Sequence, residues 1–169
     1  MKTVLPISIC EVQTPNGTVA YVTLAPSGEA MKRGLITQEI VGQLLDATRA
    51  GQDLVPDNFA RNRAFVEFLH GVIQKHGPAI PNLIAAAGKQ ANGWVHIIDG
   101  RTPTPQGSVP AEDVMGAFQV KDGEIVAGSY RANPNHRILS HRGFFQLEPI
   151  LQQRLLDEIA AIERNSHPE

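Results

Sequence analysis

Cysteine is almost missing from this sequence, since Cys10 is the only one among 169 residues. A single cysteine cannot form an intramolecular disulfide, which excludes the disulfide-stabilised scaffolds of small secreted proteins. Cys10 also lies in an apolar opening stretch, a setting typical of a buried and inert thiol. The sequence therefore predicts a protein of a reducing compartment.

Long apolar runs are lacking too. No segment approaches the roughly 18 consecutive apolar residues that a membrane-spanning helix needs. The first ten residues resemble a lipoprotein signal, but Pro6 interrupts their short apolar run, and the bulky Ile9 stands where cleavage requires a small residue. We therefore expect a cytoplasmic protein without a membrane partner.

Aromatic and charged residues are scarce, at 5% and 19% of the chain, whereas hydrophobic residues make up 42%. This balance is typical of a globular protein with an aliphatic core. A chain of this length can bury about 70% of its unfolded surface, so we expect one globular domain over residues 1–169. The formal net charge of -2 excludes a globally basic nucleic-acid binder. A nucleic-acid partner is therefore not expected, although a local basic patch remains compatible with the total.

The usual signatures of nucleotide, serine and metal chemistry are absent as well. The chain contains neither a P-loop nor a dinucleotide fingerprint. Ser129 follows Gly128 but lacks the closing glycine of a nucleophile elbow. Six histidines are present, yet His70 and His76 are six residues apart on a predicted helix, whereas residues on one helix face are three or four apart. We expect neither a metal nor a cofactor.

Two glycine-containing turns predict β-hairpins. Asn16-Gly17 separates residues 3–12 from 18–25, and Asp122-Gly123 separates residues 114–120 from 124–130. Turns of this kind need positive φ angles, which glycine adopts without steric cost. A further buried strand is predicted at Trp94–Ile98, a short β-branched run between glycines.

Helical spacing of apolar residues predicts four helices, at residues 37–50, 58–76, 81–92 and from Pro149 onward. The last of them would bury Leu151, Leu155, Ile159 and Ile162. Strands and helices do not alternate regularly, which disfavours a doubly wound fold. The predicted class is α+β, with a mostly antiparallel sheet built from two hairpins plus a central strand, and about four helices packed on one side.

Asp99 and Arg101 follow the predicted central strand directly. In one interpretation Asp99 accepts hydrogen bonds from the next backbone amides in a turn, and Arg101 faces solvent as its partner. In the other, Asp99 acts as a general base or orients a ligand. Glu112 and Asp113 resemble a paired-carboxylate site only superficially, because adjacent residues on a strand point to opposite faces.

Residues 131–142, here called the arginine-rich segment, contain three arginines, two histidines and no carboxylate. Arginine presents a planar set of donors to carboxylate or phosphate, and asparagine and histidine can bind neighbouring polar groups. The residues expected to contact a ligand are Arg131, Asn133, Asn135, His136, Arg137, His141 and Arg142. The competing interpretation is a hydrated surface loop.

Two classes of function follow from this segment. The first is a binding or interaction module that holds an anionic small molecule or an acidic protein partner. The alternative is a small enzyme in which His136 is the general acid and base, Asp99 orients it, and arginines hold an anionic substrate. The enzyme requires Asp99 and His136 to lie in one concave site.

Overall fold

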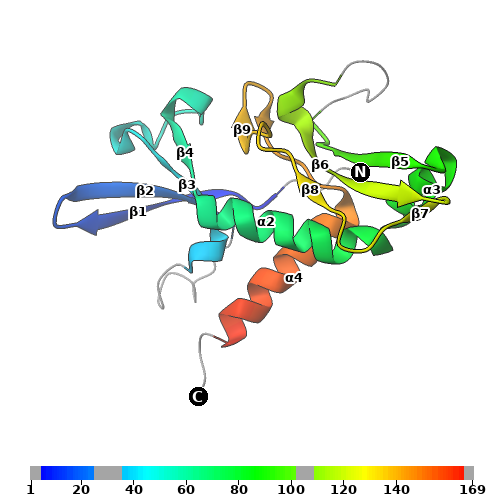
Figure 1. The fold of residues 1–169 in the computed structure, drawn as a ribbon. Helices are drawn as coiled ribbons and strands as arrows, with labels where there is room; N and C mark the ends of the chain where they lie inside the picture. The colour runs from blue at the N-terminus through cyan, green and yellow to red at the C-terminus, as the bar shows by residue number, and fades with distance from the viewer. Residues whose placement is uncertain (1–4, 25–35, 102–108, 166–169) are drawn as a thin grey trace.

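The computed structural model describes residues 5–24, 36–101 and 109–165. Its first sheet has the order β1 (Ser8–Thr14), β2 (Gly17–Thr23), β3 (Ile40–Leu44) and β4 (Phe59–Arg61), and each neighbouring pair is antiparallel (Figure 1). Thr14 pairs with Gly17, whose φ is 119°. The predicted first hairpin is therefore confirmed. Residues 3, 4 and 25 of its two predicted strands lie outside the described residues.

The second sheet lies at the other end of the molecule (Figure 1). It contains β5 (Gly93–Ile98), β6 (Val114–Lys121), β7 (Glu124–Ile125) and β8 (Arg131–Ala132), and β6 pairs with all three others. Asp122 and Gly123 have φ angles of 53° and 78°, which confirms the second hairpin. The strand predicted to continue to Tyr130 ends at Ile125, because the chain turns through Gly128 and rejoins β6 only at β8.

The remaining strands and the helices complete an α+β fold. β9 (Leu139–Ser140) pairs with β10 (Gly143–Phe144), and the α-helices of the described residues are α2 (Arg63–His76), α3 (Pro81–Gln90) and α4 (Pro149–Asn165). Short 3-10 helices occur at Thr37–Glu39, Ala47–Arg49, Pro56–Asn58, Gly77–Ala79 and Ala111–Asp113. The predicted class is right, but three α-helices are present in this part of the chain and the antiparallel strands form separate sheets.

The helix predicted at residues 37–50 is wrong. A 3-10 turn at Thr37–Glu39 leads instead into β3, which pairs with β2 and β4. Apolar positions in a short run satisfy both helical and strand patterns, so pairing with neighbouring strands decides the outcome. A Cβ on Gly42 would lie 2.5 Å from the Phe59 ring, so the close approach of β4 requires glycine at this position.

The helix predicted at residues 58–76 begins later than expected. Residues Phe59–Arg61 form β4, and α2 starts after Asn62, whose side chain accepts a hydrogen bond from the Ala64 amide at 3.2 Å. Asparagine is a favoured N-cap because it satisfies an amide that lacks a helical partner. The helices predicted at residues 81–92 and from Pro149 are present with small differences in their ends.

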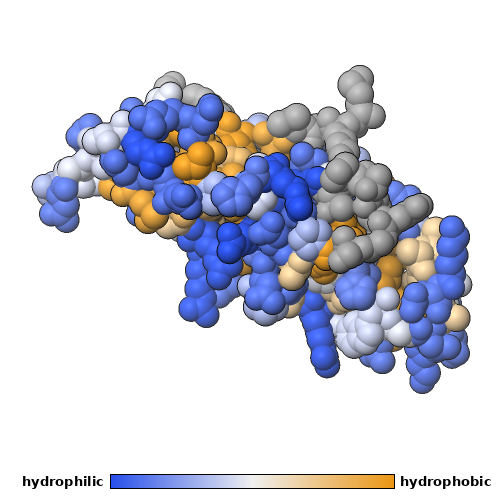
Figure 2. Space-filling model, turned by 90° about the horizontal axis from the view of Figure 1, so that it is seen from above, coloured by the Kyte–Doolittle hydropathy of each residue, from blue (hydrophilic) through white to orange (hydrophobic). Residues whose placement is uncertain are grey.

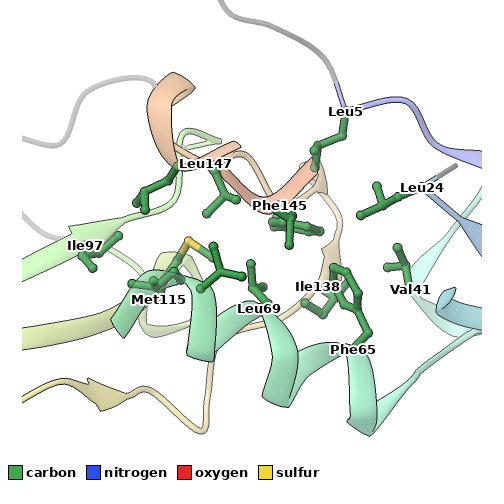
Figure 3. Packing of buried hydrophobic residues seen from close by; sticks show 14 of the residues in the cluster. Leu5, Leu24, Val41, Phe65, Leu69, Ile97, Met115, Ile138, Phe145 and Leu147 are labelled. Carbon is green, nitrogen blue, oxygen red and sulfur yellow. The ribbon is translucent and has the colours of Figure 1, made fainter. Parts of the chain in front are cut away.

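One cluster of buried apolar side chains joins both sheets (Figure 3). Leu69 of α2 lies near its middle. Phe65 and Val41 lie toward the first sheet, and Ile97 and Met115 lie toward the second. The buried positions of α4 are Leu151, Leu155 and Ile159, as predicted. Seen from above, hydrophobic surface gathers over the side that carries β1 to β4, with polar residues around it (Figure 2).

Candidate functional site

Asp99 leaves the end of β5 as a fully buried carboxylate. Its Oδ1 accepts hydrogen bonds from the backbone amides of Arg101 at 3.0 Å and Gln146 at 2.8 Å. The turn predicted after this strand is therefore confirmed. The solvent-facing position predicted for Arg101 is wrong, because its side chain is 0% exposed.

Arg101 joins the end of β5 to the arginine-rich segment. Its Nη2 lies 2.9 Å from Oδ2 of Asp99 and donates to the carbonyl oxygen of Arg137 at 2.7 Å. Its Nη1 donates to Oγ of Ser140 at 3.0 Å and to the carbonyl oxygen of Gly143 at 2.9 Å. A buried guanidinium is tolerated where its charge and donors find partners, and these contacts satisfy both Nη atoms. Its buried Nε has no hydrogen-bond partner among the described residues.

His136 binds the same carboxylate. Its Nε2 lies 2.9 Å from Oδ2 of Asp99, and the His136 side chain is 2% exposed. Nε2 also lies 3.4 Å from Nη2 of Arg101. The ionised carboxylate of Asp99 can only accept, so Nε2 carries a proton that it donates to Asp99. A protonated Nε2 cannot also accept a hydrogen bond from the Arg101 guanidinium. The structure therefore brings together the two residues that the enzyme hypothesis pairs.

Asp113 neutralises Arg142, one of the arginines of the arginine-rich segment. Its Oδ2 lies 2.5 Å from Nη1 of Arg142, and its Oδ1 lies 3.5 Å from Nη2 of Arg101. Asp113 is fully buried, whereas the Arg142 side chain is 45% exposed. The charge of Arg142 is thus committed to an internal carboxylate.

Other members of the segment are directed to different places. Arg131 lies over the Trp94 ring, 5.2 Å from its centre. The Asn133 side chain donates to the carbonyl oxygens of Ala111 and Val114, each at 2.7 Å, and so fastens the segment to β6. His141 is exposed. The structure therefore does not gather all seven predicted ligand residues into one site.

Asn135, His136 and Arg137 do share a cavity, which has a volume of about 510 Å3. Its remaining lining residues are Arg61, Pro110, Ala111, Glu112 and Pro134. Arg137 forms a loose ion pair with Glu112, with 3.7 Å between Nε and Oε2. Among the described residues, none forms an ion pair with Arg61.

Sequence reasoning missed Arg61 because it assigned this residue to a helix. Arg61 ends β4, 76 positions before Arg137 in the printed numbering. No local sequence pattern predicts that these two arginines line the same cavity. The pairing of β4 with β3 is what brings Arg61 there.

A second polar contact lies between α2 and the loop that precedes β8. Nδ1 of His70 lies 2.7 Å from the Tyr130 hydroxyl. Burial lowers the pKa of His70 to about 4, and electrostatic repulsion from His136 is the second, smaller cause. Burial also raises the pKa of Tyr130. At neutral pH His70 is therefore uncharged and Tyr130 keeps its proton.

No group of three or more histidine, cysteine, aspartate or glutamate side chains within the described ranges is arranged to hold a metal ion. The helices of the same ranges lack the combination of length and hydropathy that crossing a bilayer requires. Comparison with protein-family models, with curated proteins and with solved structures finds no match to this chain.

Proposed function

We propose that this protein binds a small anionic molecule in the cavity between Arg61 and Arg137. The observation that carries the proposal is the Arg61 side chain, which borders the cavity and has no carboxylate partner among the described residues. An exposed pair such as Arg137 and Glu112 is held weakly, so an incoming anion can compete for Arg137.

The charge balance around the cavity supports this proposal. The cationic residues are Arg61, Arg101, Arg137 and Arg142, and the carboxylates are Asp99, Glu112 and Asp113. One positive charge is left over, and it belongs to Arg61. A concave site with a few converging polar groups suits a small molecule better than a flat protein surface.

The backbone around the cavity is held before a ligand arrives. Arg101 binds the carbonyl oxygen of Arg137, and Asp99 binds the ring of His136. A site with fixed backbone and ring positions loses less entropy on binding. His136 lines the cavity, and no described residue bonds to its Nδ1, which leaves that nitrogen for a ligand.

Isothermal titration calorimetry with inorganic phosphate and with succinate tests the proposal. We expect Arg61→Ala and Arg137→Ala each to weaken binding by roughly tenfold to a hundredfold, as for a lost charge-assisted contact. Arg131→Ala is the matched control, because Arg131 belongs to the same segment but lies against Trp94. Equal binding by all variants, or no binding by the wild type, would refute the site.

A second candidate function is catalysis by His136 as a general acid and base. The observation that favours it is the 2.9 Å contact of Nε2 with Asp99, which leaves Nδ1 as the nitrogen that would exchange a proton. A panel of p-nitrophenyl phosphate and p-nitrophenyl acetate tests it. Turnover that His136→Asn abolishes and Arg131→Ala retains would support an enzyme, and equal rates in both variants would exclude this role for His136.

A further inference from the structure

A second cavity, of about 440 Å3, adjoins the proposed anion site, and Arg61 lines both. It lies over the first sheet and at the start of α2. Its lining residues are Tyr21, Thr37, Ile40, Gly42, Gln43, Ala60, Arg61, Asn62 and Arg63. Each cavity falls within the size range of small-molecule sites. Arg61 pairs with Gly42 at the end of β4, the edge strand of this sheet, so its long side chain borders a cavity on each side of that edge.

The floor of this second cavity is a row of cross-strand neighbours. Tyr21 of β2 pairs with Gln43 of β3, and Gln43 pairs with Ala60 of β4. Directly paired residues of adjacent strands lie on the same face of a sheet. The ring of Tyr21 and the amide of Gln43 are thus presented side by side.

Several polar groups that line this cavity have no hydrogen-bond partner in the part of the chain that the structure describes. No described residue hydrogen-bonds to the Tyr21 hydroxyl, the Gln43 amide or the Thr37 hydroxyl. Asn62 differs, because its amide nitrogen donates to the carbonyl oxygens of Thr37 and Ile40, at 3.1 Å and 2.8 Å. The cavity therefore offers neutral donors and acceptors together with the apolar surfaces of Tyr21 and Ile40.

We infer that the ligand is a phosphorylated sugar or polyol, with its phosphate between Arg61 and Arg137 and its hydroxyl-bearing part over Tyr21 and Gln43. This inference rests on the anion site proposed above. A sugar ring has hydroxyl groups that match the amide and hydroxyls of this cavity, and C–H faces that pack on an aromatic ring. A free inorganic anion would leave these groups unused.

The test compares inorganic phosphate with ribose 5-phosphate and glucose 6-phosphate by calorimetry. At least one sugar phosphate should bind tenfold or more tightly than inorganic phosphate. Gln43→Ala and Tyr21→Phe should remove most of that advantage and leave phosphate binding unchanged, whereas Arg61→Ala should weaken every probe. Gln13→Ala is the matched control, because Gln13 is an exposed glutamine on β1 outside both cavities.

The outcomes separate the two proposals. If the wild type binds phosphate but neither sugar phosphate binds more tightly, the inference is wrong and the anion site stands. If the advantage persists in both Gln43→Ala and Tyr21→Phe, the sugar lies elsewhere and the inference also fails. If the wild type binds none of the probes, the anion site itself is refuted. Thermal melts of each variant show whether the fold is retained.

Discussion

Asp99 and His136 lie 37 positions apart in the sequence and meet through a hydrogen bond of 2.9 Å inside the protein. The same Oδ2 atom of Asp99 lies 2.9 Å from Nη2 of Arg101. The Asp99 carboxylate therefore contacts both the Arg101 guanidinium and the His136 ring. Removing one partner from a buried charged cluster leaves the others without compensation.

Asp99→Asn should therefore lower the free energy of unfolding by about 3–5 kcal/mol, because it leaves the buried Arg101 charge without its nearest counter-charge. Urea denaturation followed by circular dichroism measures the change. Glu112→Gln is the control, since it removes a charge from the solvent-exposed pair with Arg137 and should cost about 1 kcal/mol or less. Equal losses in the two variants would show that the contact between Asp99 and Arg101 contributes no more to stability than an exposed ion pair does.

Leu155→Ala should cost about 2–5 kcal/mol, the usual result of truncating a buried leucine. Leu155 is 0% exposed and belongs to the stripe by which α4 packs on the core. Arg154→Ala changes the exposed neighbouring position and should alter stability by about 0.5 kcal/mol or less. A loss below about 0.5 kcal/mol for Leu155→Ala would contradict the packing of α4.

Acidification should destabilise the protein through His70. Its pKa is lowered to about 4 in the folded state, so between its ordinary value of about 6.5 and 4 the unfolded chain binds a proton that the folded chain does not. The stability that His70 contributes is therefore complete above pH 6.5 and is lost as the pH falls toward 4. His70→Asn keeps a donor near the position of Nδ1 but does not titrate.

Urea melts of the wild type and His70→Asn at pH 7 and pH 5 measure this effect. The wild type should lose more free energy of unfolding between the two pH values than the variant, because other titrating groups are common to both. Parallel losses would show that His70 titrates normally in the folded protein.

Gly77→Ala should destabilise the end of α2 by about 1–3 kcal/mol, the usual cost of overpacking. An added Cβ would lie 2.6 Å from the Phe118 ring. Gly71→Ala is the matched control, because Gly71 lies inside α2, where an added Cβ meets nothing within 4 Å. That variant should gain about 0.5–1 kcal/mol from helix propensity. Thermal melts that rank the variants in the opposite order would contradict the packing of α2 on β6.

Local chemistry determined the features that the sequence predicts correctly. Asn16-Gly17 and Asp122-Gly123 need positive φ angles at the turn itself, so neighbouring residues are enough to place both hairpins. The apolar stripe of α4 repeats over several turns at helical spacing, and only a helix buries it on one side.

Tertiary pairing decided the structure of residues 37–61. Ile40, Val41 and Leu44 fit a short helix or a strand equally well, and the hydrogen bonds of β2 and β4 select the strand. Those bonds come from residues distant in the chain. Because of the same pairing, Arg61, which was expected in a helix, ends β4 and lines the cavity.

The sequence by itself identified Asp99, His136 and Arg137 as candidates. Asp99 follows a predicted buried strand, and the other two lie in a segment rich in arginine, asparagine and histidine. Whether Asp99 and His136 touch was decided only by the fold, since their contact joins the end of β5 to a segment 37 residues away. The arginine-rich segment looks uniformly cationic in the sequence because its neutralising carboxylates, Asp99, Glu112 and Asp113, come from outside it. Electrostatic balance depends on distances in space, and these are set by the tertiary structure.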